Sequence, residues 1–503
     1  TNGSFSGTIQ NAGGALALVK NSGGGLTLSG ANTYSGGTTI NGGLITPGNT
    51  NAIGTGILTI NSGGIFYPVA NLAFTNAVTL NGGTLEVGGA NGHVLSFNGP
   101  VAVTAASAIK ADGSTYGIYL NGGLDMGSGG YTLSCYNGTS GNGNQISGIT
   151  GASGTILNGS IGNLWITGSN TFAGTFRATN SGPLIFSSVY ALQNATLDMN
   201  AADIGGVSFS ANVIIGALTG SRDLNLGSRA ISIGNNNANT LYSGAMTNTG
   251  SLTKVGNGTL TLSGANTYPG KTTINAGTLA LSGSGSIASA DIIVAGGASL
   301  DVSALSSAFG LAGRTLTNSS VGAVLNGTND CTTGTLALVY DGVNASFIQT
   351  NGTMTLSAST VIQINNTGAP LSAGSHKIIA AATTGNIGKV TGLLPSVTIT
   401  GNGAAGTVTL QFNGSGGLDL VVTTATPSQP VISSIVLSGA NLILQGTNGT
   451  ASATYSIITA TNLTTPLVNW TTNISGTLTA GGAFSNAIPL GAEPARFFQI
   501  KTP

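Results

Sequence analysis

The run GKTT ends the string LSGANTYPGKTT at residues 262–273 and has the residue types of a phosphate-binding loop. Such a loop needs Gly, four residues and then Gly-Lys-Ser/Thr, so that consecutive backbone N–H groups surround the phosphates while the Lys reaches the outer ones. Gly264 and Gly270 are separated by five residues, which is one too many. Residues 28–39 read LSGANTYSGGTT, the same string with Ser35 in place of Pro269 and Gly37 in place of Lys271. We therefore interpret the string as a structural repeat and expect no nucleotide or other cofactor.

The best local group for acid–base chemistry lies between residues 203 and 229. Asp203 and Asp223 are 20 residues apart and each precedes an aliphatic residue, so a fold with that period would place both on one face. Arg222 and Arg229 lie close to them in the sequence. Carboxylates and basic groups on one face can bind or cleave polysaccharides. These four residues are the candidate carbohydrate face; the competing interpretation, which the low charge density favours, is solvated corners with ion-paired arginines.

The other residues with catalytic or ligand-binding side chains give weaker signals. His93 and His376 are the only histidines, and neither has an acidic neighbour in the sequence, so we interpret each as a lone surface or corner residue. Two Cys and two His, widely scattered, do not make a zinc site. The string GNGAAG at 401–406 matches Gly-x-Gly-x-x-Gly but precedes another strand-like run, so it indicates a turn. We expect no catalytic residue and no metal.

Three aromatic residues occupy one position of the repeated string, namely Tyr34, Tyr268 and Phe172. We expect them to pack at a corner of the fold. Stacking on a sugar ring is the less favoured alternative for these three residues and for Trp470.

The composition excludes several classes of partner. The chain has 503 residues with 12 Lys+Arg and 12 Asp+Glu, and charged residues make up 5% of it, where about a quarter is usual. With zero net charge and no basic run, neither nucleic acid nor an anionic membrane surface is an expected partner. No apolar run approaches the roughly 18 residues of a membrane span, and Thr1 opens no leader, so we expect that any export signal is absent from this sequence. Cys135 and Cys331 do not make a disulfide framework.

Short apolar strings recur along the chain and define its organisation. They end at Ile40, Ile60, Leu80 and Leu120, each followed by Asn, with a spacing of 20 residues and one register skipped near Val101. Gly or Ser-Gly and a second apolar string follow, which indicates a strand, a tight corner and a strand. Hairpins alone would not explain the regular return of the corner. A period of about 20 to 30 residues is typical of a solenoid, so we predict a parallel β-helix with Asn stacked on Asn, rather than a meander or a sandwich.

The segment SLTKVGNGTLTLSGANTYPGKTTINAGTLAL at residues 251–281 resembles the autotransporter-associated β-strand repeat, also called the passenger-associated transport repeat. A second clear copy, LTLSGANTYSGGTTINGGLI, lies at 26–45, and a degenerate copy, GNLWITGSNTFAGTFRATN, lies at 162–180. The resemblance implies a right-handed parallel β-helix that forms the stem of a secreted or surface-exposed bacterial protein. It implies no catalytic residues, because the repeat of that family carries none.

The sequence departs from the autotransporter pattern towards its end. A Pro-containing linker at 426–431 leads into residues 432–503, where the pattern would place the amphipathic strands of a translocator barrel. Strand-like strings in 432–503 predict a small antiparallel β-sandwich. We therefore predict an all-β chain with a right-handed parallel β-helix (β-solenoid) over 1–425 and a C-terminal β-sandwich module. Without the barrel, the chain would need another export route.

These features favour a non-enzymatic exported structural protein, a component of a bacterial surface or extracellular fibre or stalk. The alternative is a carbohydrate-active enzyme or a carbohydrate-binding adhesin that uses one face of the β-helix. Contacts with a cell surface or a polysaccharide would serve either function.

The N-terminal segment 1–25 enters strand-like sequence at once and holds a single charge, Lys20. Exposed strand edges at the ends of a β-helix can pair with another chain. We therefore predict a head-to-tail homopolymer, because a heterologous contact that does not close into a ring produces a filament. The candidate contact residues are Ser4, Phe5, Thr8, Ile9, Leu16 and Leu18.

Overall fold

The computed structural model describes residues 2–89, 92–113, 116–138, 143–383, 387–424, 428–493 and 495–502. The chain forms two compact units, Thr1–Val422 and Thr423–Pro503. Both consist of β-strands, and the helix found in the described residues is a single 3₁₀ turn, η1 (Leu467–Asn469). The all-β prediction is confirmed.

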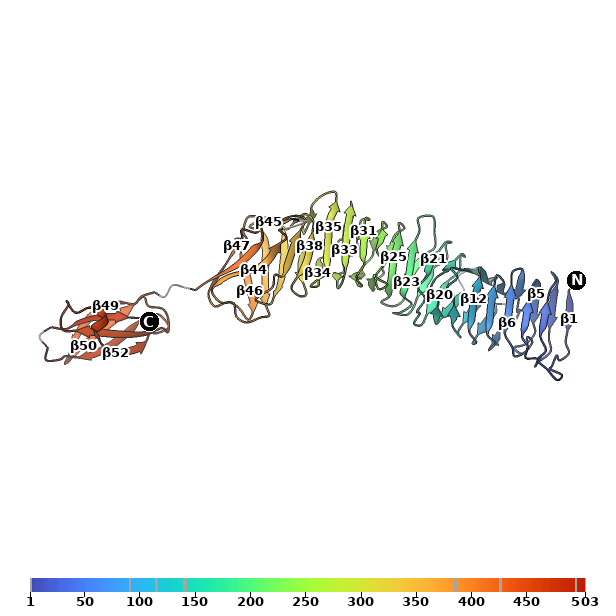
Figure 1. Cartoon of the computed structure of the whole chain (residues 1–503), viewed down its shortest axis with the longest axis horizontal. Helices are drawn as coiled ribbons and strands as arrows, with labels where there is room; N and C mark the ends of the chain where they lie inside the picture. The colour runs from blue at the N-terminus through green and yellow to red at the C-terminus, as the bar shows by residue number, and fades with distance from the viewer. Residues whose placement is uncertain are drawn as a thin grey trace. The chain divides into compact units, whose positions relative to one another are not determined.

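The first unit is a parallel β-solenoid whose strands stack coil upon coil (Figure 1). Strand β4 (Thr38–Ile40) pairs in parallel with β2 (Leu18–Lys20) before it and with β6 (Leu58–Asn61) after it. Strand β5 (Gly43–Pro47) pairs in parallel with β7 (Gly64–Phe66). Strands on the two sides of a corner therefore pair with neighbouring coils and not with each other. The corner is not a hairpin, and the predicted solenoid is confirmed.

The strands of the first half of the solenoid form three faces in the described residues. One face holds β2, β4, β6, β9 (Val78–Asn81), β12 (Val101–Ala105), β15 (Leu124–Asp125) and β18 (Ile149–Thr150). A second face holds β8 (Leu72–Phe74), β11 (Val94–Phe97), β14 (Gly117–Leu120), β17 (Asn144–Ser147), β20 (Leu164–Thr167), β22 (Leu184–Phe186) and β24 (Val207–Phe209). The third face holds β1 (Gly3–Phe5), β3 (Gly25–Leu28), β5, β7, β10 (Thr84–Val87), β13 (Ser107–Ala111), β16 (Thr132–Asn137), β19 (Thr155–Asn158), β21 (Thr175–Ala178), β23 (Leu192–Met199) and β25 (Ile214–Gly220).

The second half continues as two rows, because β25 pairs with both β27 and β28. One row is β27 (Ala230–Ile233), β30 (Ser251–Lys254), β32 (Thr272–Ile274), β34 (Asp291–Val294), β37 (Thr315–Asn318), β40 (Gly334–Tyr340), β43 (Thr360–Asn366) and β46 (Val397–Gly401). The other is β28 (Thr240–Tyr242), β31 (Thr259–Leu262), β33 (Thr278–Gly283), β35 (Ser299–Leu305), β38 (Ala323–Asn326), β41 (Phe347–Thr350) and β44 (Gly374–Ala381). Short strands complete the coils: β26 (Leu224–Asn225), β29 (Met246–Thr247), β36 (Phe309–Gly310), β39 (Asn329–Asp330), β42 (Gly352–Leu356) and β45 (Gly388–Gly392).

The core of the solenoid is a set of aliphatic columns. Ile40, Ile60 and Leu80 are in register on successive coils, and all three are fully buried. Each coil leaves an apolar face that only its neighbours cover, so burial continues along the whole stack. Cys135 and Cys331 lie in the same core as free, buried thiols.

Asparagines stack at the corners of the first coils, as predicted. The side-chain amide of Asn41 donates to Asn21 Oδ1 (2.6 Å), that of Asn61 donates to Asn41 Oδ1 (2.6 Å), and that of Asn81 donates to Asn61 Oδ1 (2.8 Å). Asn41 and Asn61 each have an Asn partner on the coil before and on the coil after, so this solvent-exposed corner is held in register.

Asn121 does not continue this column, which corrects the simple 20-residue extrapolation. It follows β14 on the second face and donates to Asn98 Oδ1 (3.1 Å). The coils are longer here than 20 residues, as the pairing of Val101 with Val78 on the coil before and with Leu124 on the coil after shows. The added residues move the next Asn to a different corner.

The first unit ends with a change of strand direction. Strand β48 (Leu418–Thr423), which follows β47 (Thr407–Phe412), pairs antiparallel with β44. His376 lies opposite Leu420 in this pairing. The reversal occupies an edge of β44 that a further parallel coil would need.

The second unit is a small antiparallel sandwich. One sheet has the order β49 (Val431–Ser438), β50 (Asn441–Thr447) and β53 (Phe484–Pro489), and the other has the order β52 (Thr471–Thr477), β51 (Thr454–Ala460) and β54 (Phe497–Lys501). Their inner faces share a separate core that contains Leu444, Tyr455, Ile457, Leu478, Phe484 and Ile488.

Candidate functional site

The repeated string LSGANTY forms a corner between β3 and β4 and, in its second copy, between β31 and β32. In the first copy, the Tyr34 hydroxyl lies 2.6 Å from Thr38 Oγ1; in the second, the Tyr268 hydroxyl lies 2.7 Å from Thr272 Oγ1. Both tyrosines are fully buried, and burial raises the pKa of Tyr268 to about 12. The two hydroxyls therefore stay protonated and available as hydrogen-bond donors.

The asparagine of the same string joins three coils. Asn32 Oδ1 accepts a hydrogen bond from the Ile9 N–H (2.7 Å), and its amide donates to the Ala52 carbonyl (2.6 Å). Asn266 makes the corresponding contacts in the second copy, at 2.8 and 2.9 Å. A buried amide whose donors and acceptor are satisfied across coils fixes their relative position.

The degenerate copy keeps part of this arrangement. Asn170 accepts from the Ile149 N–H (2.7 Å) and donates to the Ala191 carbonyl (3.0 Å). Phe172 replaces the Tyr, so the hydroxyl contact is lost, but its ring is 1% exposed. The expected corner packing of the three aromatic residues is thus confirmed, and none of them offers a face to a sugar.

A lysine that the sequence interpretation overlooked also belongs to the repeat. Lys254 is fully buried, in register between Ile233 and Ile274 of the aliphatic columns. Its Nζ donates to the carbonyls of Val255 (2.7 Å), Gly256 (2.7 Å) and Ala276 (3.2 Å). Desolvation lowers the pKa of its ammonium group to about 8.

Lys20 occupies the corresponding position of the first copy. Its Nζ donates to the Ser22 and Gly42 carbonyls, the latter at 3.1 Å. The signal for this role was the alignment of ALVKNSGGGLTL with SLTKVGNGTLTL, which places the two lysines together.

Lys271, the residue that raised the question of a phosphate site, points into solvent. Its side chain is 65% exposed, and its Nζ lies 4.0 Å from Asp291. The residues after it form β32, whose backbone pairs with β30 and β34. A strand and not a helix follows the loop, so no helix N-terminus is available to a phosphate. The backbone of this strand is already paired within the solenoid.

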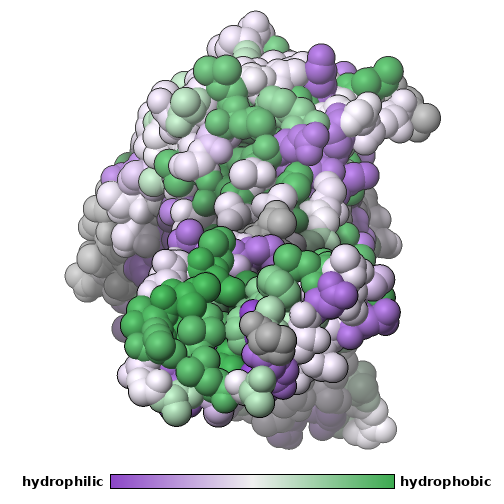
Figure 2. Space-filling view, turned by 90° about the vertical axis from the view of Figure 1, so that its left-hand side faces the viewer, coloured by the Kyte–Doolittle hydropathy of each residue, from purple (hydrophilic) through white to green (hydrophobic). Residues whose placement is uncertain are grey.

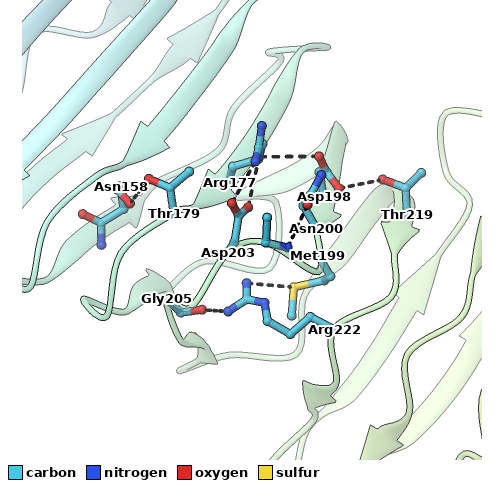
Figure 3. A network of polar contacts seen from close by, with 11 residues as sticks. Asn158, Arg177, Thr179, Asp198, Met199, Asn200, Asp203, Gly205, Thr219 and Arg222 are labelled. Atoms are coloured by element: carbon cyan, nitrogen blue, oxygen red, sulfur yellow. Dashed lines mark hydrogen bonds and ion pairs between the residues drawn. The ribbon is translucent and has the colours of Figure 1, made fainter.

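Asp203 forms the most buried ion pair among the described residues (Figure 3). Its side chain is 4% exposed and accepts two hydrogen bonds from Arg177, from Nε (3.0 Å) and Nη2 (2.8 Å). Arg177 Nε also lies 3.6 Å from Asp198. The hydrogen bonds that Arg177 donates to Asp203, together with the negative charges of Asp203 and Asp198, raise the pKa of the guanidinium. Asp203 is therefore held in a bidentate pair.

Arg222 and Asp223 point to other partners. Arg222 Nη1 donates to the Gly205 carbonyl, and its Nη2 lies 3.9 Å from Met199 Sδ (Figure 3). Asp223 Oδ1 accepts from the Ala245 N–H (2.8 Å) of the next coil. Among the residues described, no hydrogen bond or ion pair joins Asp203 to Asp223.

The fourth candidate, Arg229, contributes backbone contacts: its N–H donates to Leu226 and its carbonyl accepts from Ser251. The sequence interpretation missed Arg177, the partner that decides the environment of Asp203. The sequence signal for this contact was that Arg177 and Asp203 are separated by about the length of one coil. Thr175 on β21 and Thr196 on β23, which are in register, define that length.

The six assembly candidates lie in the first coil. Strand β1, which contains Ser4 and Phe5, pairs with β3 alone in the described part of the chain. Phe5 and Leu16 are 42% and 45% exposed, Thr8 is exposed, and Ile9 and Leu18 are half-buried.

The remaining candidates form no catalytic group. His93 packs edge-on against Tyr116, and His376 Nε2 lies 2.8 Å from the Ser372 carbonyl. The segment 401–406 joins β46 to β47, as expected of a turn. Within the described ranges, no group of three or more His, Cys, Asp or Glu could hold a metal ion. In the same ranges, no helix is long and apolar enough to cross a membrane.

Comparisons with known proteins agree with the repeat geometry. The passenger-associated-transport-repeat family matches residues 18–46 and 252–281, the two segments in which Lys, Asn and Tyr occupy corresponding positions. The chain is also 32% identical over 287 residues to the "Adhesin BmaC autotransporter" of Brucella suis biovar 1 (strain 1330). That alignment covers 54% of this chain and 7% of the adhesin, so the chain spans a small part of its relative. No solved structure matches the chain. The chain thus carries two passenger-associated-transport repeats, built into one parallel β-solenoid.

Proposed function

We propose that this chain is a non-enzymatic part of an exported protein, displayed at the bacterial surface or outside the cell, where its solenoid serves as a stem for adhesion. The observation that carries the proposal is the corresponding set of Asn and Tyr contacts in the two matched repeats, inside a solenoid similar in sequence to part of an adhesin. Those contacts join neighbouring coils of the stack.

The environment of the charged residues supports a structural role. Asp203 is paired with Arg177, Asp223 holds a backbone N–H, and Lys254 holds three carbonyls. A catalytic acid or base must reach a substrate, whereas these groups already contact the protein.

Labelling of intact producing cells tests the location. An antibody against the solenoid should label unpermeabilised cells or the culture medium, and brief protease treatment of intact cells should remove that label. A cytosolic marker protein serves as the control and should survive the protease. Labelling that requires permeabilisation would contradict the proposal.

We also propose that copies assemble head to tail through the first coil. Strand β1 has a free edge in the described residues, and two residues of the first coil leave apolar surface exposed, Phe5 on β1 and Leu16 just before β2. An added strand would satisfy the backbone groups of that edge and cover this surface. The C-terminal end of the solenoid differs from this free edge, because there β48 runs antiparallel along β44 and pairs with it.

Deletion of residues 1–25 should abolish polymers while the remaining coils stay folded. Analytical ultracentrifugation and electron microscopy measure the first result, and far-UV circular dichroism measures the second. The substitution of Phe5 by Glu is a milder form of the same test. An intact protein that stays monomeric at high concentration, or a truncated one that still polymerises, would exclude this mode of assembly.

A further inference from the structure

A groove of about 650 Å³ lies on the outer face of the β52–β51–β54 sheet in the second unit. Its floor is made by strands, and one wall is made by the η1 turn and the residue that follows it. The lining residues include Ser456, Ile458, Leu467, Val468, Trp470, Thr472, Ser475 and Lys501. None of them belongs to the repeats, so the groove is independent of the proposed function of the solenoid.

The floor of the groove presents hydroxyl groups in register. Ser456 on β51 lies opposite Ser475 on β52, and their Oγ atoms are 2.9 Å apart. Thr454 lies opposite Thr477 in the same pairing, and both line the groove. Hydroxyl groups both donate and accept hydrogen bonds, so such a floor can bind the hydroxyl groups of a ligand as donor or as acceptor.

Trp470 forms the aromatic wall. Its Nε1 donates to the Thr465 carbonyl (2.8 Å), and its backbone N–H donates to the Leu467 carbonyl (3.1 Å). The residue is thereby held through its backbone and its indole and is half-buried, and the polar atom of the ring is already satisfied. What it offers to the groove is therefore ring surface.

The lip beside the Trp is apolar and open. Leu467 is 52% exposed and Val468 is 88% exposed, next to each other in η1. Figure 2 shows that exposed apolar side chains gather on the surface of the second unit. Its large exposed apolar residues are Val431, Ile435, Val436, Leu437, Leu463, Leu467, Val468 and Leu490. The lip therefore adds apolar contact area to the edge of the groove.

A single cation completes the groove. Lys501 lies opposite Ser456 on β54, it is exposed, and in the described part of the chain no carboxylate forms an ion pair with it. Residues 423–503 contain Arg496 and Lys501 against one acidic residue, Glu493. A carboxylate on a ligand would therefore meet an ammonium group that is free to bind it.

We propose that this groove binds a polysaccharide segment that contains uronic acid. One sugar ring places its C–H face on Trp470, the ring hydroxyls bond to the Ser and Thr side chains of the floor, and the uronate carboxylate contacts Lys501. A pyranose ring has an apolar face and a polar rim, which matches an aromatic wall beside a hydroxyl-lined floor.

A peptide strand fits the groove less well. β51 is the central strand of the sheet and pairs with both β52 and β54, so the backbone groups of this strand are already bonded. An extended peptide binds mainly through backbone hydrogen bonds to a free edge. Recognition over this central strand comes from side chains, as in sugar binding.

Fluorescence of the full chain tests the proposal. The chain has two Trp residues, so the substitution Trp165→Phe in the solenoid leaves Trp470 as the single indole. Titration of that variant with a galacturonate hexamer should quench and shift the emission with saturation. In a pull-down on immobilised polygalacturonate, Trp470→Ala should bind roughly tenfold more weakly than the natural chain, because one stacked ring is lost.

The controls separate stacking from unfolding. Leu463→Ala removes an exposed apolar side chain of the same segment that does not line the groove, and binding should not change. Trp470→Phe keeps an aromatic ring and should bind better than Trp470→Ala. Lys501→Met should weaken binding of the galacturonate hexamer but not of cellohexaose. The absence of saturable binding to either hexamer, or equal binding by Trp470→Ala and the natural chain, would overturn the proposal.

Discussion

The solenoid and the second unit use the same kinds of side chain in opposite ways. In the solenoid, Tyr268 is buried against Thr272, and Lys254 binds carbonyls inside the stack. In the second unit, Trp470 and Lys501 line an open groove. A residue type therefore does not indicate a binding site by itself. What matters is whether the fold has already satisfied its polar atoms and covered its apolar surface.

The difference follows from repetition. Each coil of the solenoid needs its neighbours to cover its apolar face, so side chains at repeated positions are used in joining coils. The second unit closes its own core, which contains Leu444, Tyr455 and Phe484, and does not need the outer face of its second sheet. That face can therefore carry a ligand without loss of the fold.

The largest expected effect is a charge placed in an aliphatic column. Ile274→Asp should lower the free energy of unfolding of the solenoid by about 4 kcal/mol or more, because an unpaired carboxylate would replace a fully buried side chain. Limited proteolysis with mass spectrometry should show new cleavage in the coils around β32 while a fragment near residues 423–503 stays intact. Thr273→Asp, at the neighbouring half-buried position, is the control and should cost much less. Cleavage throughout the second unit would show that the two units do not unfold separately.

The next effect concerns the buried ion pair. Arg177→Met leaves the carboxylate of Asp203 without its partner and should cost about 2 to 4 kcal/mol in urea-induced unfolding. Adding Asp203→Asn should recover part of that loss, because the uncompensated charge is gone. Lys110→Met is the matched control, since its pair with Glu86 is more exposed at both ends and should matter less. If Arg177→Met had no effect on stability but removed binding to a polysaccharide, the candidate carbohydrate face would regain support.

A smaller effect should appear as a pH dependence. The Lys254 ammonium has a pKa of about 8 in the folded chain and 10.5 as the ordinary value, so between these pH values the unfolded chain binds more protons. The free energy of unfolding should therefore rise with pH in this window, by about 1 kcal/mol per pH unit at most. In Lys254→Met this rise should vanish. Chemical denaturation of both chains at pH 7.5, 9 and 10.5 measures the difference, and identical slopes would place the titration elsewhere.

The regular part of the fold could be predicted because each coil repeats the same local problem. The columns through Ile40 and the stacked Asn41 follow from period and residue type alone. Asn121 could not be placed, because longer coils moved it to another corner. Arg177 was missed for a related reason: the contact to Asp203 depends on where the chain crosses between coils, and one sequence shows that only as an approximate spacing.

The groove in the second unit was beyond prediction from sequence. Trp470 was a candidate for stacking on a sugar, but its neighbours in the groove come from three strands between residues 454 and 502. Their register depends on antiparallel pairing with a bulge between Ile457 and Ile458. No repetition in the sequence reveals that register.

The smallest expected effect returns to Lys271, in the string that resembled a phosphate loop. Lys271→Gly copies the first repeat into the second and should cost less than about 1 kcal/mol, from a weak exposed ion pair and the added freedom of Gly. The reverse exchange, Gly37→Lys, should cost more. Gly37 has a φ of 89°, and a Cβ there would lie 2.7 Å from the Ile57 carbonyl oxygen. Thermal unfolding of both variants measures this asymmetry. Equal costs would mean that the two corners share one backbone conformation, whereas a large loss from Lys271→Gly would show that this Lys, unlike Lys254, has a role outside the repeat.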